Sequence, residues 1–300
     1  MGTPEFAVPS LDILLQNGFD VAAVVTAPDK PAGRGMQLQE SAVKRFAASH
    51  GLKILQPLKL KDEVFLQELK ALQPDLQVVV AFRMLPESVW QLPRIGTINL
   101  HGSLLPQYRG AAPINRAIMN GEEVTGVTTF FLQHEIDTGK IIFQERMPIA
   151  EKETAGELHD RMKITGAELV LKTVQAIAKG NYPQQSQEEA TNLKKAPKIF
   201  TADTMLDWTQ GTDELFNHVR GLSPYPGAFT TYQGKIIKIF TAEKIKQPHS
   251  LTPGAIKTDG KTYLWFTTRD GFIDVKTLQM EGKKKMSAEE FLRGFKIGGA

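Results

Sequence analysis

Three polar side chains stand at spacings that suit proton movement and charge stabilisation. Asn99 and His101 form an Asn-x-His pair at the end of an apolar stretch, and Asp137 follows within Ile136-Asp-Thr-Gly139. Side chains alternate along a strand, so Asn99 and His101 would lie on one side of it. The sequence pairs no nucleophilic Ser or Cys with His101 and has no second His at metal-ligand spacing. The set therefore predicts acyl transfer in which the protein moves protons and stabilises charge but never becomes acylated.

Each of the three residues has a role in such a reaction. When an amine attacks a carbonyl, an oxyanion forms, the attacking nitrogen loses a proton, and the departing nitrogen gains one. Asn99 offers a fixed amide donor and a protonated His101 offers a second donor to the oxyanion. Asp137 would orient the imidazole and accept the proton of the amine, directly or through a water. Taken singly, each residue is more often structural, but the three together favour a catalytic site.

The first two-thirds of the sequence alternates helix and strand patterns, which indicates an open, mainly parallel α/β sheet. Apolar spacing and end signals predict helices over residues 5–17, 41–50, 61–72 and 154–179. Short apolar or β-branched runs predict strands over residues 21–26, 76–81, 97–101 and 126–132. Ligands of such sheets bind beyond the carboxyl ends of the strands, and Asn99 and His101 fall at such an end.

The pattern changes after about residue 181. Residues 182–203 are rich in Pro, Gln, Glu and Lys and read as a linker between a first domain, 1–181, and a second, 204–300. The second domain is predicted to hold one short helix and several short strands, which suggests a small β-barrel. The expected helix covers residues 212–221, and the expected strands cover 228–232, 235–242, 254–257, 262–268 and 271–277.

The beginning of the sequence does not fit this pattern. A parallel α/β domain usually opens with a strand, whereas Met1-Gly-Thr-Pro4 is typical of a loop. We therefore expect a first strand to precede Met1.

Composition narrows the class of protein. With 41% hydrophobic and 23% charged residues, the chain is an ordinary globular protein. It contains 0 Cys, which excludes disulfides and thiolate chemistry and fits a reducing compartment. No apolar run approaches the roughly 20 residues of a membrane span. The net charge of +3 alone does not indicate a polyanionic partner.

The segments Asn99–Pro113, Gly126-Val-Thr128 and Ile136–Gly139 resemble the folate-dependent formyltransferases. The resemblance implies direct transfer of the formyl group of 10-formyltetrahydrofolate to an amine, through a tetrahedral intermediate and without a metal or a covalent enzyme intermediate. It implies a Rossmann-like domain with an open, mainly parallel sheet, followed by a small OB-like β-barrel domain. It assigns catalysis to Asn99, His101 and Asp137. It assigns folate contacts to two segments: Ser103, Leu104, Leu105 and Pro106, and Phe82, Arg83, Met84 and Leu85.

Within the family, three further segments are most similar to the members that formylate methionyl-tRNA. They are Met1–Ala7, the loop Pro28–Gly35 and a carboxy-terminal part from Ala196 to Met286. This likeness implies that Arg34 reaches the acceptor end of initiator methionyl-tRNA, with Lys30 as a supporting phosphate contact. It also implies that the barrel grips the tRNA, with Lys283, Lys284 and Lys285 as contacts. A cytoplasmic monomer is expected. The sequence departs from the family at Phe82-Arg83, where a small residue is common.

Two alternatives remain open at this point. A sugar-nucleotide N-formyltransferase would share the Asn-x-His and Asp core, but it would not need the loop Pro28–Gly35. An inactive RNA-binding protein on the same fold would have no use for Asn99, His101 and Asp137 together. The basic residues of the second domain are also compatible with a plain solvated surface.

Overall fold

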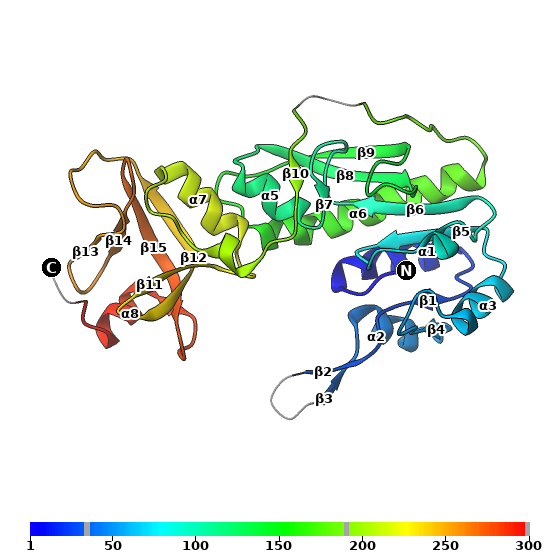
Figure 1. The fold of residues 1–300 in the computed structure, drawn as a ribbon, viewed down its shortest axis with the longest axis horizontal. Coiled ribbons are helices and arrows are strands. Elements are labelled where there is room, and N and C mark those ends of the chain that lie inside the picture. The colour runs from blue at the N-terminus through cyan, green and yellow to red at the C-terminus, as the bar shows by residue number, and fades with distance from the viewer. Residues whose placement is uncertain (33–36, 189–191, 298–300) are drawn as a thin grey trace. The chain divides into compact units, whose positions relative to one another are not determined.

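The chain forms two compact units. The computed structural model describes residues 1–32, 37–188 and 192–297 (Figure 1). Unit 1 consists of Met1–Gly110, Gly126–Met147 and His159–Lys195. Unit 2 consists of Ala111–Thr125, Pro148–Leu158 and Ala196–Ala300. Neither unit is one continuous segment, because two stretches from the first half of the chain belong to unit 2.

The sheet of unit 1 combines a parallel and an antiparallel part. β1 and β4 form a parallel pair, and a second sheet has the order β5-β6-β8-β9. Within it β5 and β6 are parallel, whereas β6 and β8 are antiparallel. In this second sheet, parallel pairing is thus found between β5 and β6 but not between β6 and β8. The strands are β1 (Val24–Val25), β4 (Ile54–Leu55), β5 (Leu76–Val80), β6 (Gly96–His101), β8 (Val124–Phe131) and β9 (Ile141–Pro148).

Gly2 joins these two parts of the sheet. Its N–H donates to the carbonyl of Val25 at 3.1 Å, and it forms a parallel bridge with Val80. The order across unit 1 is therefore β4, β1, Gly2, β5, β6, β8 and β9. Since β1, β5 and β6 all run parallel, the loops that leave their carboxyl ends lie along the same edge.

The four predicted helices of unit 1 begin within two residues of their expected starts, whereas the short helix Glu87–Trp90 was not predicted. Ser41 accepts a hydrogen bond from the Lys44 N–H and so caps one helix, and Asp62 caps the next through the Phe65 N–H. Gly166 lets the longest helix approach β6, because an added Cβ there would lie 2.7 Å from a methyl of Leu100. The helices are η1 (Glu5–Ala7), α1 (Val8–Gln16), α2 (Ala42–Ser49), α3 (Glu63–Ala71), α4 (Glu87–Trp90) and α6 (Ala155–Ala178), the last beginning in unit 2.

One predicted strand is much shorter than expected. The sequence predicts a strand over residues 21–26, but only Val24–Val25 pairs with β4. Residues 21–23 instead border a cavity between β1 and β5. Without a neighbouring strand on that side, the apolar pattern of residues 21–23 does not produce a ladder of hydrogen bonds.

Unit 2 is built on an antiparallel sheet, in agreement with the predicted series of short strands. Its order is β11-β12-β15-β14-β13, and β16 pairs with β15. The register of β12 against β15 shifts on either side of Thr241, and such irregularities curl a sheet. The strands are β11 (Ala228–Tyr232), β12 (Lys235–Ile245), β13 (Ile256–Thr258), β14 (Leu264–Thr267), β15 (Phe272–Met280) and β16 (Met286–Ser287).

Helices close the core of unit 2. Buried side chains of α7, β12, β15 and α8 form one hydrophobic cluster that includes Phe216, Ile239, Ile273 and Phe291. Trp208 stacks on Phe266 at its side, with ring centroids 4.7 Å apart. The helices are α5 (Pro113–Met119), η2 (Thr201–Thr204), α7 (Thr212–Gly221) and α8 (Ala288–Gly294).

Two short two-stranded sheets complete the fold. They are β2 (Lys30–Ala32) with β3 (Gln37–Gln39), and β7 (Arg109–Gly110) with β10 (Lys195–Ala196). In the described part of the chain, no helix combines the length and apolarity needed to cross a membrane.

Candidate active site

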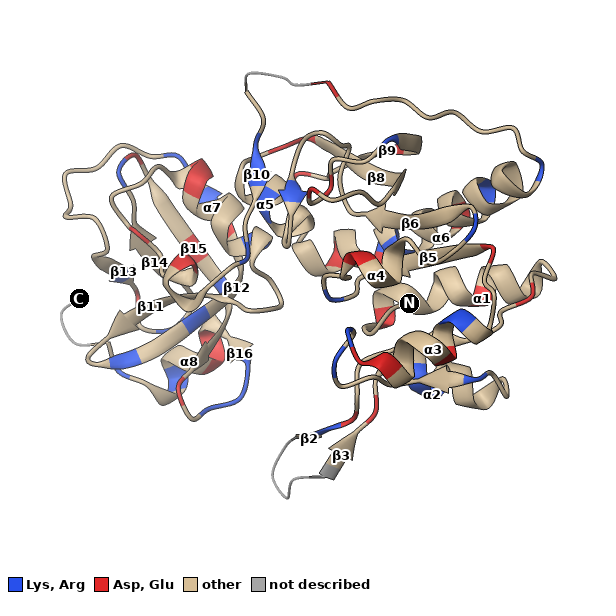
Figure 2. Cartoon of the chain, turned by 45° about the vertical axis from the view of Figure 1, so that its right-hand side comes forward, with Lys and Arg blue, Asp and Glu red and all other residues tan. Residues whose placement is uncertain are grey.

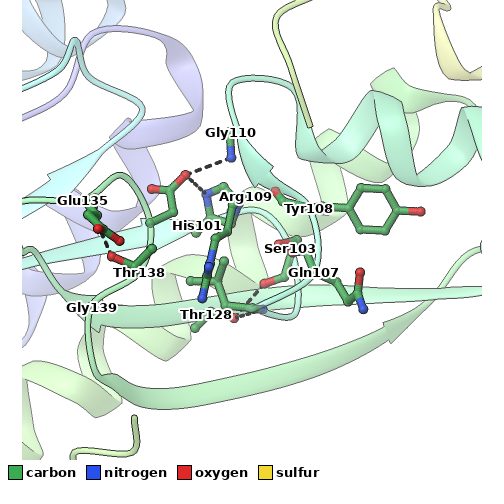
Figure 3. A network of polar contacts seen from close by, with 12 residues as sticks. His101, Ser103, Gln107, Tyr108, Arg109, Gly110, Thr128, Glu135, Thr138 and Gly139 are labelled. Carbon is green, nitrogen blue, oxygen red and sulfur yellow. Dashed lines mark hydrogen bonds and ion pairs between the residues drawn. The ribbon is translucent and has the colours of Figure 1, made fainter. Parts of the chain in front are cut away.

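His101 is the last residue of β6 and is held in one orientation. Its imidazole is 6% exposed, and Nε2 lies 2.8 Å from the backbone carbonyl of Tyr108. A carbonyl only accepts, so Nε2 carries a hydrogen and donates it. The other ring nitrogen, Nδ1, faces the carboxylate of Asp137, with 3.8 Å between Nδ1 and Oδ2 (Figure 3). Nδ1 is therefore the ring nitrogen left for chemistry.

Asp137 is held in place from both its side chain and its backbone. Its Oδ2 accepts a hydrogen bond of 2.9 Å from the Gly110 N–H. Its φ of 55° lies in the left-handed region, which Asp tolerates better than most residues. This conformation turns the carboxylate of the loop between β8 and β9 toward His101. The sequence prediction that these two residues meet is realised in the geometry.

A glutamine from a distant segment fixes the Asp137 loop. Gln187 Nε2 donates to the backbone carbonyls of Asp137 and Gly139, at 2.9 and 2.8 Å. Its Oε1 accepts two hydrogen bonds from the Arg109 guanidinium, at 3.0 Å from Nε and 2.6 Å from Nη2. The sequence analysis gave Arg109 no role of its own, although this residue lies within the segment Asn99–Pro113. It missed Gln187 because that residue lies in a stretch whose composition is typical of a linker.

Asn99 shares the His101 face of β6. It pairs with Val79 of β5 and Phe130 of β8 in the middle of the sheet, and it is half-buried. Its side-chain amide has no hydrogen-bond partner among the described residues, unlike the imidazole of His101. The amide N–H₂ is thus available to an incoming carbonyl oxygen.

Gly139 allows the loop to close tightly on β8. A Cβ added at Gly139 would lie 1.7 Å from the carbonyl oxygen of Phe131. Gly126 is similarly confined, since an added Cβ would lie 2.1 Å from the carbonyl oxygen of Glu145. The two glycines of the quoted motifs thus serve close packing around the site.

The segment Ser103–Pro106 forms a buried turn beside His101. Ser103 is fully buried and its hydroxyl donates to the Gln107 carbonyl at 2.6 Å. Thr128 of β8 ties the turn down, because its hydroxyl donates to the Ser103 carbonyl at 2.6 Å and accepts from the Leu105 N–H at 3.1 Å (Figure 3). Leu105 packs in a small cluster with Phe130. Leu104 and Pro106 are only half-buried and offer the more accessible side chains of the turn.

Residues 82–85 lie at the carboxyl end of β5. Arg83, Met84 and Leu85 line an open cavity of about 770 Å³, together with residues 58–61. Arg83 links the two sides of this cavity, since its guanidinium donates to the backbone carbonyl of Leu58 at 3.0 Å and also to that of Pro57. Phe82 packs against the hydrophobic cluster of β1, β4 and α3.

The hairpin formed by β2 and β3 leaves the same edge of unit 1. The Asp29 carboxylate at its base accepts hydrogen bonds from the Lys44 ammonium and from Gln56 Nε2, the latter at 2.8 Å. The Lys44 hydrogen bond, with help from Gln56, lowers the pKa of Asp29 below its ordinary value. Lys30 is exposed at the start of β2, whereas the predicted contact residue Arg34 lies outside the described residues.

The predicted basic contacts of unit 2 lie between β15 and β16. Lys283, Lys284 and Lys285 are all exposed there, and the Lys285 ammonium lies 4.6 Å from the centre of the Phe240 ring. Further lysines stand on the β12 strand, among them Lys235 and Lys238 (Figure 2). In residues 1–32, 37–188 and 192–297 no three His, Asp or Glu side chains are grouped so that they could hold a metal ion.

Comparison with protein families agrees with this geometry. A profile described as "Formyl transferase" matches residues 1–174, and one described as "Formyl transferase, C-terminal domain" matches residues 198–296. Together these profiles cover most of both units. The chain belongs to the formyltransferase family.

Relatives of this formyltransferase carry a more specific name. Proteins named methionyl-tRNA formyltransferase from Bacteroides fragilis and Parabacteroides distasonis are 50% and 53% identical to it. Each match covers 99% of this chain and 94% of the relative. The similarity thus includes the second unit as well as the catalytic one.

Solved structures share the formyltransferase fold. A sugar 3N-formyl transferase, WlaRD, determined with dTDP and 5-N-formyl-THF, superposes with a TM-score of 0.69 at 22% identity, covering 94% of this chain and 97% of that one. HypX from Aquifex aeolicus, in complex with tetrahydrofolic acid, has a TM-score of 0.62 at 22% identity and covers 84% of this chain and 44% of its own. These likenesses concern the fold alone.

Proposed function

We propose that this formyltransferase transfers the formyl group of 10-formyltetrahydrofolate to the α-amino group of methionyl-tRNA and so supplies formylmethionyl-tRNA for translation initiation. The observation that carries the proposal is 50% identity over 99% of the chain to a protein of that name. The arrangement of Asn99, His101 and Asp137 supports it, because these groups suit transfer of an acyl group to an amine. We place the enzyme in the cytoplasm as a monomer.

The site stabilises the oxyanion with two donors. Attack of the amine nitrogen on the formyl carbon forms a C–N bond and moves the carbonyl electron pair onto oxygen. The free amide of Asn99 and the Nδ1–H of a protonated His101 donate to that oxygen from one face of β6. His101 must be protonated for this, because its Nε2–H is already given to the Tyr108 carbonyl.

Asp137 accepts the proton that the attacking amine loses. Its Oδ1 is not the oxygen that accepts from Gly110, so one carboxylate oxygen is left for the attacking amine or a bridging water. The same carboxylate also orients the imidazole, since its Oδ2 lies 3.8 Å from Nδ1. When the intermediate collapses, the C–N bond to the folate nitrogen breaks and that nitrogen takes up a proton. No step uses a covalent bond to the protein, and we propose that none needs a metal.

The donor has two candidate contact regions on unit 1. Arg83, Met84 and Leu85 line the open cavity at the end of β5, and Leu104 and Pro106 are the accessible part of the turn after β6. Both segments follow parallel strands at the edge where Asn99 and His101 lie. Two structural neighbours, HypX and WlaRD, were determined with folate compounds, which supports a folate donor here.

The acceptor tRNA has candidate contacts on both units. The hairpin of β2 and β3 carries Lys30 and leaves the catalytic edge of unit 1, so we assign it to the acceptor end. Arg34, which lies outside the described residues, stays the proposed main contact. We assign the curled sheet of unit 2 to an OB-like role, with Lys283, Lys284 and Lys285 contacting phosphates. Matching residues 198–296 to a family-specific second domain supports a role for it in the same reaction.

A sugar-nucleotide N-formyltransferase is the second candidate function. The similarity of fold to WlaRD favours it, since that match covers 94% of this chain. The identity of 22% to WlaRD is far below the 50% shared with the methionyl-tRNA enzymes. The β2–β3 hairpin also favours the tRNA, because a small sugar nucleotide would not need it.

A direct acceptor test separates these functions. Labelled formyl from 10-formyltetrahydrofolate is offered together with methionyl-tRNA, uncharged tRNA or a panel of dTDP-amino sugars. We expect label in acid-precipitable methionyl-tRNA and at least about 1,000-fold lower kcat/KM for every amino sugar. Preferential labelling of an amino sugar would reverse the assignment, and labelling of neither would contradict formyl transfer altogether.

A further inference from the structure

The backbone carbonyl that holds His101 belongs to a residue in an uncommon conformation. Tyr108 accepts the Nε2 hydrogen of His101 at 2.8 Å. Its φ of 60° lies in the left-handed region, which a bulky aromatic residue rarely adopts, and the residue is only 5% exposed. A residue keeps such a conformation only where its surroundings determine it. The orientation of His101 therefore depends on the contacts that fix the Tyr108 backbone.

The stretch that the sequence marks as a linker supplies one of these contacts. The Tyr108 N–H donates to the Lys194 carbonyl at 2.7 Å. Both residues belong to unit 1. Lys194 is exposed, so burial among apolar side chains does not fix its position. Its position therefore depends on the hydrogen bonds of its backbone.

Gln107 binds the other backbone group of Lys194. Its Oε1 accepts a hydrogen bond of 2.9 Å from the Lys194 N–H. The Gln107 backbone is itself fixed, because its carbonyl accepts from the Ser103 hydroxyl at 2.6 Å and its N–H donates to the Leu104 carbonyl at 3.1 Å (Figure 3). Thr128 of β8 ties this turn to the sheet. Gln107 thus joins Lys194 to the turn after β6.

These contacts form one series of hydrogen bonds that ends at the imidazole. The Gln107 side chain binds Lys194, and Lys194 binds Tyr108. The Tyr108 carbonyl then accepts the Nε2 hydrogen of His101. A neutral imidazole has one ring hydrogen, which either nitrogen can carry. The series keeps that hydrogen on Nε2 and leaves Nδ1 facing the carboxylate of Asp137.

The same carbonyl also matters when His101 is protonated. Both ring nitrogens then carry a hydrogen, and the bond from Nε2 to Tyr108 fixes the direction of the Nδ1–H. A donor to an oxyanion is effective only when it is oriented before the charge develops. Loss of the Tyr108 carbonyl would let the ring rotate away from that direction.

We propose that Gln107 is a positioning residue for formyl transfer, which fixes the orientation and the tautomer of His101 through the backbone of Lys194. Gln187, from the same linker-like stretch, holds the loop of Asp137. This stretch therefore supports both members of the His–Asp pair. The kinetic part of the inference rests on the proposed function, whereas its structural part does not depend on the acceptor.

Three variants of the full chain test the role of Gln107. Gln107→Met has a similar size but no oxygen that could accept the hydrogen of the Lys194 N–H. Gln107→Glu keeps an acceptor oxygen at the same distance from the backbone. Gln184→Ala is the control, since Gln184 lies exposed in the linker-like stretch.

Four measurements follow the series from the backbone to the reaction. Amide hydrogen exchange reports the bond made by the Tyr108 N–H. Nitrogen NMR of histidine-labelled chains at alkaline pH shows which ring nitrogen of His101 carries the hydrogen, and a His101→Gln chain identifies the signals. Steady-state kinetics gives kcat and KM for methionyl-tRNA and for 10-formyltetrahydrofolate. Thermal midpoints report stability.

In Gln107→Met the Tyr108 amide should exchange at least about 10-fold faster. The His101 signals should change from the Nε2–H form to a mixture of tautomers. The kcat should fall by about 10-fold, with both KM values within about twofold and the thermal midpoint within a few degrees. Gln107→Glu should restore the tautomer and most of kcat, and Gln184→Ala should change none of these quantities.

The outcomes that would overturn the proposal differ from those that would overturn the proposed function. Unchanged exchange and NMR signals in Gln107→Met would refute the series of hydrogen bonds, and an unchanged kcat would refute the positioning role. Failure of Gln107→Glu to restore the tautomer would show that the acceptor oxygen is not the cause. If the unaltered chain left methionyl-tRNA unformylated, the proposed function would fail, but exchange and NMR would still decide the role of Gln107 at His101.

Discussion

At the scale of single residues, the orientation of Asp137 depends on partners distant in sequence. Gln187 holds two carbonyls of the Asp137 loop, and Arg109 holds Gln187. Neither could be predicted, because a Gln in a Pro- and Gln-rich stretch carries no pattern that marks its contact. By contrast, the Asn-x-His spacing is enough to predict that Asn99 and His101 share one face of a strand. The alternation of side chains along a strand is a local property, whereas the contacts of Gln187 and Arg109 form only in the folded chain.

The first prediction concerns the hydrogen bonds by which Gln187 holds the Asp137 loop. Gln187→Ala should lower kcat for formyl transfer by roughly 10-fold, because the carboxylate loses its fixed position, while KM for methionyl-tRNA stays within about twofold. Gln184→Ala is the matched control, since Gln184 lies exposed in the same segment. Steady-state kinetics with thermal midpoints separate positioning from stability. If Gln187→Ala and Gln184→Ala have the same kcat, Gln187 has no positioning role.

At the scale of elements, the close contact of the Asp137 loop with β8 predicts a strong stability effect at one glycine. Gly139→Ala should destabilise the fold by about 2 kcal/mol or more, because the new Cβ would overlap the Phe131 carbonyl oxygen. Gly294→Ala is the control, as an added Cβ there meets no atom within 4 Å. Urea unfolding compares the two variants. Equal midpoints would show that the loop can move away from β8 without cost.

The hairpin gives a second prediction at this scale. Asp29→Ala removes the carboxylate that ties its base to Lys44 and Gln56. We expect a drop of about 5- to 10-fold in kcat/KM for methionyl-tRNA and unchanged folate affinity, because the hairpin is assigned to the acceptor end. Glu68→Ala removes a different carboxylate that pairs with Lys53 at 3.1 Å and serves as control. A parallel loss in both variants would refute the assignment.

The elements could be predicted where their signals are local. Helices such as α2 and α7 have caps and apolar periodicity, and β11 has the expected bounds Ala228–Tyr232. The strand expected at residues 21–26 failed because its ladder needs a neighbour that the local pattern cannot supply. The short helix α5 and the antiparallel strand β9 were not predicted. Residues 111–125 and 148–158 belong to unit 2 through tertiary contacts, which no local sequence pattern reveals.

At the scale of the whole molecule, a buried imidazole of unit 2 links stability to pH. Burial lowers the pKa of His218 below its ordinary value of 6.5, so just below pH 6.5 the unfolded chain binds more protons than the folded chain. Stability should therefore fall as the pH is lowered through this window. Denaturant unfolding at pH 8, 6.5 and 5 measures the slope. His218→Gln should remove this part of the slope, and an equally steep slope in that variant would contradict the linkage.

The central claim is that Asn99, His101 and Asp137 carry out formyl transfer to methionyl-tRNA, and single-turnover kinetics test it most directly. Enzyme in excess over labelled methionyl-tRNA, saturated with 10-formyltetrahydrofolate, reports the chemical step alone. We predict that Asn99→Ala, His101→Ala and Asp137→Asn each slow this step by at least about 100-fold, with tRNA affinity and thermal midpoint unchanged. Rates within about threefold of the unaltered enzyme in any folded variant would contradict the role of that residue, and such rates in all three would contradict the site.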